Sequence, residues 1–250
     1  MKKASSILLL LILSFLLMSI IVRHDIPDER FIELGKKYPQ ICHLSDGEAT
    51  LIKENWVVTA AHAAILLSEE LENGKTPKVS IGNKQYEVEK VILHPNFQMS
   101  DTSIENDIAL IQIKGKITSI PLAKLYDKQN EIGKQITIVG RGDFGTGLTG
   151  PQNWDKITRA ATNRIDGVDG QWIIFNFDNP QSENTTELEG ISGPGDSGGP
   201  AFIDLDNVRY IVGVSSNQAD NDSGKQGIYG VTEYYARISF YKKWIEESIK

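Results

Sequence analysis

Short runs of β-branched and aromatic residues recur along most of this chain, at intervals of roughly 8 to 15 residues with turn-forming residues between them. Helical patterns do not alternate with these runs, which argues against the strand–helix repeats of a parallel α/β sheet. The spacing therefore predicts an all-β barrel or sandwich. The expected strands occupy residues 49–52, 56–59, 78–81, 85–93, 108–113, 135–139, 172–177, 200–203 and 210–215.

Three segments depart from this β pattern. A short helix is expected to run from the alanine-rich residues after 60 to about residue 71. Apolar residues at helical spacing predict an amphipathic helix over about 239–249, packed on the β body. Residues 23–40 are charged and contain two prolines, and we expect them to form a surface arm that leads into the fold.

The first 19 residues have the pattern of a secretory signal peptide. Two lysines follow the initiator methionine, and residues 7–20 are almost entirely apolar, so cleavage is expected after Ser19. An uncleaved anchor is the alternative, but about 14 apolar residues are short for a span of about 20. We therefore expect one domain over residues 20–250, in a secreted or periplasmic protein with no stable membrane association after cleavage.

Charge and cysteine content narrow the class of protein further. The net charge is −7 and no basic cluster offers phosphate neutralisation, which disfavours nucleic acid as a partner. Cys42 is the single cysteine, so no intramolecular disulfide can form. A buried apolar role is expected for it, with pairing between chains as the alternative. The expected state is a monomer.

Residues 195–200, Gly-Asp-Ser-Gly-Gly-Pro, place one serine between glycine-rich flanks. Such a turn can aim the backbone N–H groups of Gly195 and Ser197 into one small volume, where they would stabilise the oxyanion of a tetrahedral intermediate. Ser197 would then be the nucleophile. A serine hydroxyl is weak at neutral pH, so it needs a positioned base and a group that orients that base.

All four histidines precede Ser197 in the chain. This order excludes the α/β-hydrolase arrangement, in which the histidine follows the serine. His62 is the best candidate base, because it follows an apolar strand and lies among alanines that leave room for its ring. The other histidines lie in polar or turn-forming stretches: His24, His43 and His94.

Asp107 is the candidate for the orienting acid. It opens the apolar strand expected at 108–113, and an acid that is partly buried there needs a partner. A hydrogen bond to the imidazole of His62 would fix its tautomer and stabilise the imidazolium. Taken alone, Asp107 fits better as a strand-initiating cap.

Three motifs in this order resemble those of the chymotrypsin/trypsin-like serine peptidases. They are Thr-Ala-Ala-His at 59–62, Asn-Asp-Ile-Ala-Leu at 106–110 and Gly-Asp-Ser-Gly-Gly-Pro at 195–200. The resemblance extends from about residue 41 to the C-terminus, and includes residues 140–142, which are similar to the family's Gly-Trp-Gly. The missing family cysteines suggest a bacterial-type member.

The resemblance implies a fold and a mechanism. The fold would be two six-stranded β-barrels with a C-terminal α-helix, divided near residues 120–135. The catalytic triad would be His62, Asp107 and Ser197, and the oxyanion would be held by the N–H groups of Gly195 and Ser197. The substrate would be a protein or peptide and a protein inhibitor is a possible partner, with no metal or organic cofactor needed.

Substrate recognition and activation depart from the family pattern. Ile191 stands where trypsins carry an aspartate, so an apolar pocket floor and cleavage after a neutral or apolar residue are expected; a slip in the alignment would bring in Glu189 instead. Ser216 matches a serine that lines the family's cleft. Asp196 matches the acid that pairs with a new N-terminal amino group. Cleavage after Ser19 would itself create that terminus, unless residues 20–22 are only the end of the apolar segment.

Three functions are compatible with these residues. The first is a secreted serine endopeptidase that acts through an acyl-enzyme, which the complete triad favours. The second is a non-catalytic protease homologue that binds a protein partner. The third is an esterase or acyl transferase on the same fold.

Overall fold

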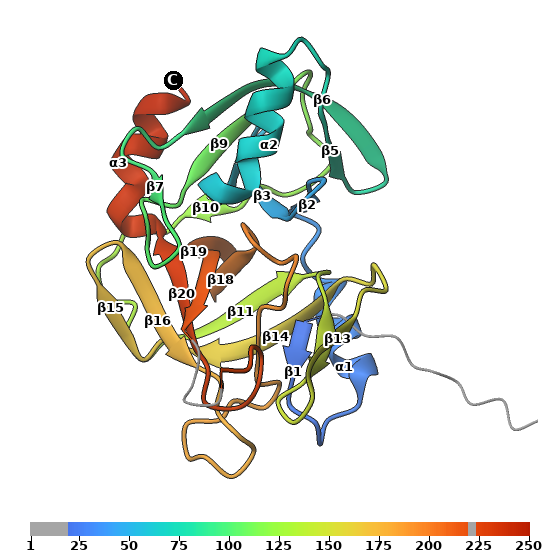
Figure 1. The fold of residues 1–250 in the computed structure, drawn as a ribbon, viewed down its shortest axis with the longest axis vertical. Coiled ribbons are helices and arrows are strands. Elements are labelled where there is room, and N and C mark those ends of the chain that lie inside the picture. The colour runs from blue at the N-terminus through green and yellow to red at the C-terminus, as the bar shows by residue number, and fades with distance from the viewer. Residues whose placement is uncertain (1–19, 220–223) are drawn as a thin grey trace, which may run out of the picture.

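The computed structural model describes residues 20–219 and 224–250, and the predicted signal peptide 1–19 lies outside this range. Two β bodies lie one above the other (Figure 1). The first is a closed barrel of six strands in the order β2-β3-β4-β9-β6-β5. Its strands are β2 (Ile41–His43), β3 (Glu48–Lys53), β4 (Trp56–Thr59), β5 (Lys78–Ile81), β6 (Lys84–Leu93) and β9 (Ala109–Ile113).

The barrel follows the predicted strands closely. β3 and β4 form the expected hairpin, and β4 pairs with β9 from Thr59 opposite Ala109 to Trp56 opposite Gln112. Leu51, Val57 and Ile111 are fully buried in its core. The helix α2 (Ala61–Glu72) begins directly after β4, as the sequence predicts, and packs against β6.

The second body is an open sheet in the order β14-β11-β18-β19-β20-β16-β15, with β10 added beside β19. The all-β class and chymotrypsin-like arrangement are confirmed, although the described strands of this half do not close into a second six-stranded barrel. The strands are β10 (Lys124–Leu125), β11 (Gln135–Gly140), β14 (Arg159–Arg164), β15 (Gly167–Asp169), β16 (Trp172–Asn176), β18 (Pro200–Leu205), β19 (Val208–Ala219) and β20 (Thr232–Arg237).

Two smaller sheets complete the β structure. One has the order β13-β12-β1-β17, and its central strand β1 pairs in parallel with β12 and antiparallel with β17. All three residues of β1 are buried. The strands of these sheets are β1 (Ile20–Val22), β12 (Phe144–Thr146), β13 (Gly150–Asn153) and β17 (Gly190–Ile191), and β7 (Gln98–Met99) with β8 (Ile104–Glu105).

The predicted surface arm at residues 23–40 is wrong in part, because it contains a helix packed on the second body. This helix, α1 (Asp28–Gly35), lies against β14 and buries Phe31 completely. The Asp28 carboxylate accepts hydrogen bonds of 2.7 and 2.8 Å from the buried guanidinium of Arg159. Arg159 lies 131 residues after Asp28, so the polar sequence around α1 gives no sign of this contact.

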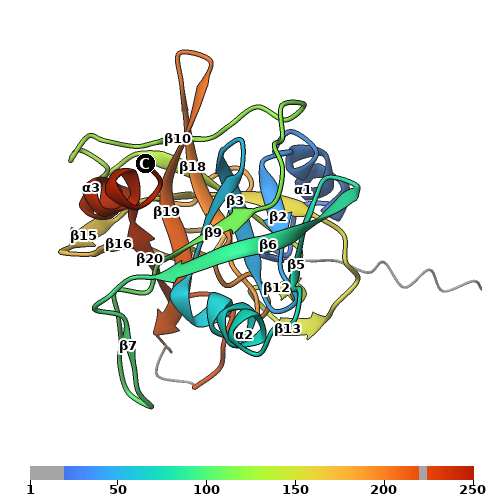
Figure 2. The ribbon, with the colours of Figure 1, turned by 90° about the horizontal axis from the view of Figure 1, so that it is seen from above.

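The C-terminal helix α3 (Ile238–Ser248) confirms the predicted amphipathic helix. It follows β20 directly, and its buried residues Ile238, Tyr241 and Ile245 join the core of the first body. Seen from above, α2 and α3 lie on different sides of the barrel (Figure 2). Because β20 belongs to the second body, this helix ties the two bodies together.

Within residues 20–219 and 224–250, no helix has both the length and the apolar character needed to cross a bilayer. Cys42 is buried, and its thiol donates to the carbonyl of Gln40 at 3.3 Å.

Candidate active site

His62 and Asp107 lie side by side because two paired strands end together. His62 is the second residue of α2, just after β4, and Asp107 precedes β9, the partner of β4. Asp107 accepts a 2.9 Å hydrogen bond from the backbone N–H of His62 through Oδ1, and a 2.7 Å bond from Nδ1 of its ring through Oδ2. Since a carboxylate only accepts, the ring proton is on Nδ1 and leaves Nε2 as the acceptor.

Ser216 adds a third donor to the same carboxylate. Its hydroxyl donates to Oδ2 of Asp107 at 2.5 Å. Ser216 lies on β19, where the pairing with β20 shifts register between Ser215 and Asn217. Such a bulge re-aims a side chain. Asp107 is fully buried, and it accepts three hydrogen bonds, one of them from the second body.

Ser197 lies on the loop between β17 and β18, in a conformation fixed by backbone hydrogen bonds. The amide of Asp196 donates to Gly193 O at 3.0 Å, and the amide of Glu48 in the barrel donates to Ser197 O at 2.8 Å. Gly195 has a φ of 92°, in the region that favours glycine. Among the residues described, the amides of Gly195 and Ser197 donate to no other group. The serine loop thus offers two backbone N–H donors that have no partner among the described residues.

The serine loop packs directly against the segment that carries His62. A Cβ on Gly47 would stand 2.6 Å from Ser197 O and 3.1 Å from the Cβ of Ala63, the residue after His62. Only glycine fits between these two segments. No hydrogen bond joins Ser197 to His62 in the described chain, and such contacts often tighten only when substrate binds. The segments that carry His62 and Ser197 therefore pack together where the two bodies meet, and the catalytic triad stays a prediction.

Asp196 directs its carboxylate into the protein, away from the cleft. It is 2% exposed and accepts hydrogen bonds from the amides of Gly142, at 2.6 Å, and Gly193, at 2.8 Å. A Cβ on Gly140 would overlap its Oδ1 at 2.0 Å, which explains the glycine there. Burial, with a contribution from the nearby Glu48 carboxylate, raises the pKa of Asp196 to about 7.

Glu48 is a buried acid that the sequence reasoning missed. Its carboxylate accepts a hydrogen bond from Nδ1 of His43 and lies 3.7 Å from Nε of Arg141. Burial raises the pKa of Glu48 well above its usual range, and lowers the pKa of His43 to about 3. Nothing in the local sequence signals this contact, since the barrel register is what places these side chains together.

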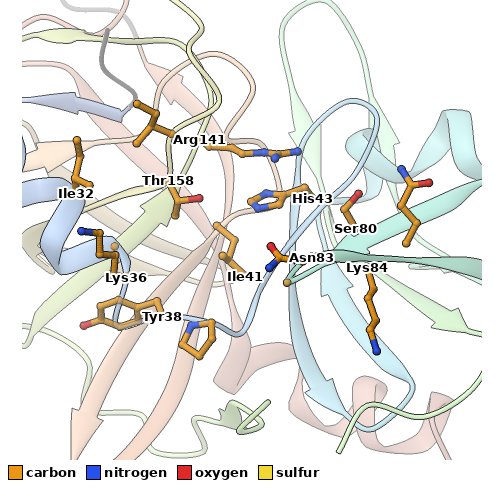
Figure 3. Close-up of a pocket in the computed structure, with 15 residues that line it drawn as sticks. Ile32, Lys36, Tyr38, Ile41, His43, Ser80, Asn83, Lys84, Arg141 and Thr158 are labelled. Carbon is orange, nitrogen blue, oxygen red and sulfur yellow. The ribbon is translucent and has the colours of Figure 1, made fainter. Parts of the chain in front are cut away.

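His43 and Arg141 also line a cavity of about 630 Å³ between the two bodies. Their side chains point toward one another from opposite sides of the cavity. Lys36 and Tyr38 also line it, and they lie below Arg141 on its side of the view (Figure 3). None of the predicted triad residues lines this cavity. It is therefore separate from the site around Ser197.

A second cavity, of about 300 Å³, adjoins Ser197 and has a polar wall. Ser216 lines it, as predicted, but Ile191 does not. Ile191 is fully buried, and its backbone pairs with Ile21 of β1; its assignment to the pocket floor stays a prediction. Glu189, the alternative, is also buried elsewhere and accepts hydrogen bonds from Thr186. The residues lining the cavity are Ser192, Gly193, Pro194, Ser197, Ser215, Ser216, Asn217, Gln218 and Gln226.

Glu233 is the acid that the sequence analysis missed beside this cavity. It is fully buried on β20, behind Ser192 and Gln218. A signal was present: Glu233 and the aromatic Tyr235 lie two apart on β20, just after Val231, and residues two apart share a face of a sheet. All three are buried.

The described residues contain no group of three or more His, Cys, Asp or Glu side chains that could hold a metal ion. The arrangement around Ser197 instead offers a hydroxyl, an imidazole oriented by a buried carboxylate, and two free backbone donors. These are the parts needed for acyl transfer.

Two β bodies that meet in this way form the fold of the serine proteases. The chain belongs to the trypsin family, because the family model described as Trypsin matches residues 35–245. It is a serine-type endopeptidase, as predicted. Whether it is a bacterial-type member stays a prediction.

Individual relatives agree with this assignment. "Trypsin" from Phaedon cochleariae is 30% identical over 211 residues, which cover 79% of this chain and 76% of that protein. "Transmembrane protease serine 11A" from Homo sapiens is 29% identical, but only 48% of its length is covered. The solved structure of mouse neuropsin, a serine protease, matches with a TM-score of 0.65 and 19% identity, covering 86% of this chain and 96% of that one. This last likeness concerns the fold alone.

Proposed function

We propose that this endopeptidase cleaves peptide bonds through Ser197, His62 and Asp107, by way of an acyl-enzyme. The observation that carries the proposal is the carboxylate of Asp107, which holds the ring of His62 at 2.7 Å from Nδ1. This contact leaves Nε2 free to act as the base. Protein or peptide substrates, and a protein inhibitor as a further partner, follow from the family.

The mechanism begins with proton transfer. Nε2 of His62 takes the proton of the Ser197 hydroxyl while Oγ attacks the substrate carbonyl carbon. The carbonyl oxygen becomes an oxyanion, held by the N–H groups of Gly195 and Ser197. The C–N bond then breaks, and His62 gives its proton to the leaving amine. Water attacks the acyl-enzyme in the same way, and the acid product leaves with Ser197 restored.

The mature N-terminus is proposed at Ile20, with its ammonium group paired to Asp196. Ile20 starts β1, and Ile21 lies 3.5 Å from the position of a Cβ on Gly193, whose amide donates to Asp196. Ile20 has a φ of 63°, which costs a β-branched residue about 1–3 kcal/mol. Cleavage after Ser19 would remove the constraint on φ. It would also give the buried Asp196 carboxylate a cation.

The same cleavage would release the protein as a secreted or periplasmic monomer. The predicted preference for a neutral or apolar residue before the scissile bond has weaker support, since it depended on Ile191. The cavity next to Ser197 is instead walled by serine and amide side chains.

Hydrolysis of a peptide amide tests the proposal against its alternatives. Ser197→Ala should lower kcat by about 10⁶-fold, because the nucleophile is lost. Ser119→Ala, at an exposed serine on the connection between the two bodies, is the matched control and should keep full activity. A wild-type protein that turns over esters but no amides would support an esterase or acyl transferase. One that turns over neither would support a non-catalytic homologue.

A further inference from the structure

Asn106, the residue before Asp107, has an unusual backbone conformation. Its φ is 51°, in the left-handed region that few residues other than glycine and asparagine adopt readily. Its carbonyl accepts a 2.8 Å hydrogen bond from the amide of Ile108, so Asp107 lies within the bend itself. The conformation of this bend therefore sets the point from which the carboxylate of Asp107 leaves the chain.

The side chain of Gln171 holds this bend from the second body. Gln171 lies in the turn between β15 and β16, and its Oε1 accepts a 2.6 Å hydrogen bond from the backbone N–H of Asn106. Within the described residues, this is the only hydrogen bond that the N–H of Asn106 donates. Because a partly buried N–H without a partner is costly, the bend depends on this acceptor.

Tyr241 orients the side chain of Gln171. The Tyr241 hydroxyl donates to the same Oε1 at 2.5 Å, and it lies 3.3 Å from Oδ1 of Asn106. Burial, together with the nearby carboxylates of Asp107 and Glu105, raises the pKa of this hydroxyl, so it stays protonated and remains a donor. One amide oxygen therefore joins the segment before Asp107, the second body and the helix α3.

The backbone of Gln171 is itself anchored. Its carbonyl accepts a 2.8 Å hydrogen bond from the amide of Arg237, the last residue of β20. The guanidinium of Arg237 donates to both carboxylate oxygens of the buried Glu131, at 2.8 and 2.9 Å. The turn that carries Gln171 is thus tied to the second body at the point where α3 begins.

We propose that Gln171 is a positioning residue for the triad: it holds Asn106, and through Asn106 it places the carboxylate of Asp107 against the ring of His62. The inference rests on the proposed function and adds a residue to it. Gln171 touches none of the reacting atoms, so its contribution is geometric. A small displacement of a group that orients the catalytic base can cost a large factor in rate.

Two substitutions of similar size separate the acceptor from the volume of the side chain. Gln171→Leu removes the acceptor and should lower kcat for a peptide amide by about 10-fold, with KM changed by less than about 2-fold. Gln171→Glu keeps an oxygen for both donors and should retain kcat within about 3-fold. Its negative charge should also raise the pKa of the acid limb of kcat/KM, because it favours the imidazolium of His62.

The matched control is Gln129→Leu, at an exposed glutamine of the second body, which should change neither kcat nor the acid limb. The ¹H NMR signal of the His62 Nδ1 proton should shift or broaden in Gln171→Leu and stay unchanged in the control. Wild-type kcat in Gln171→Leu, or an equal loss in Gln171→Leu and Gln171→Glu, would overturn the inference.

Two measurements on the wild-type protein keep the outcomes distinct. A protein that a fluorophosphonate does not label contradicts the proposed function, whereas a labelled one with unchanged kcat in Gln171→Leu contradicts only the role of Gln171. Should that variant fail to fold, hydrogen exchange decides. The amide of Asn106 should exchange at least about 10²-fold more slowly than in the unfolded chain, and exchange at the unprotected rate would contradict the contact.

Discussion

Two buried aspartates contribute to the site from opposite bodies, and they are stabilised in different ways. Asp107 accepts three hydrogen bonds, including one from the ring of His62. Asp196 accepts from two backbone amides, and burial raises its pKa to about 7. All three hydrogen bonds of Asp107 are made by residues of the described chain. Asp196 has no opposite charge among the described residues.

Two further buried acids of the second body also have a raised pKa. Burial raises the pKa of Glu233 to about 8 and that of Glu189 to about 7. Asp196 and Glu233 form no ion pair with the described residues, whereas Glu189 lies within reach of the charge of Arg23. We infer that the histidine side of the site is preformed, whereas Asp196 on the serine side awaits the positive charge of the new N-terminus.

The largest effect is expected on the histidine side. Asp107→Asn should leave the fold intact and lower kcat by about 10⁴-fold, because an amide can hold His62 in the wrong tautomer. Steady-state hydrolysis of a peptide amide measures this effect. Asp101→Asn, at an exposed aspartate, is the control. Activity near the wild-type level would remove Asp107 from the proposed triad.

A smaller loss is expected from the serine side. In a chain that begins at Ile20, Asp196→Asn should lower kcat by about 10²–10³-fold, the effect of losing an oxyanion donor, because both donors flank this residue. The ¹H NMR signal of the His62 Nδ1 proton should persist, since the contacts of Asp107 are untouched. Loss of that signal would show that the two sides are not independent.

The third donor to Asp107 should matter least for activity. Ser216→Ala removes one of its three hydrogen bonds and should lower kcat by about 10-fold, as for a bond to a charged group. The two bonds from His62 remain. A loss as large as that of Asp107→Asn would mean that Ser216, rather than His62, is the main support of this carboxylate.

The pH dependence of stability separates the precursor from the mature chain. Because the pKa of Asp196 is raised to about 7, the folded precursor holds a proton between about pH 4 and 7 that the unfolded chain has released. The contribution of Asp196 to the free energy of unfolding should therefore fall as pH rises through this range, by at most about 4 kcal/mol. Urea unfolding of Ser197→Ala precursor at pH 5 and pH 8 measures this.

The matched chain that begins at Ile20 should show a smaller fall, because the ammonium group favours the ionised carboxylate. Asp196→Asn in the precursor should also flatten the dependence. Equal slopes in the precursor, the chain beginning at Ile20 and the variant would contradict the pairing of Ile20 with Asp196.

The sequence predicted the parts of the fold that local patterns determine. Runs of β-branched and aromatic residues located five of the six barrel strands, and the helical patterns located α2 and α3. The proximity of His62 and Asp107 was also predictable, since each stands at the end of a strongly apolar strand. Their hydrogen bonds confirm the proximity, whereas their catalytic roles stay a proposal.

The sequence did not predict contacts that depend on long-range register. Helix α1 is anchored by Arg159 far along the chain, and Ile191 is drawn into the core by its pairing with β1. Glu233 faces Ser192 only because β20 pairs with β19, where Gln218 lies opposite it. A single acidic residue in a strand does not show which neighbour will bury it.

Intact mass of the protein recovered outside the cell, before and after reaction with a fluorophosphonate, tests the central claim most directly. The account predicts a chain that begins at Ile20 and gains one adduct, which Ser197→Ala does not gain. This result would show a working nucleophile together with the proposed N-terminus. A chain that begins at Ile20 but gains no adduct would contradict the account, because its serine side would remain inactive with the positive charge in place.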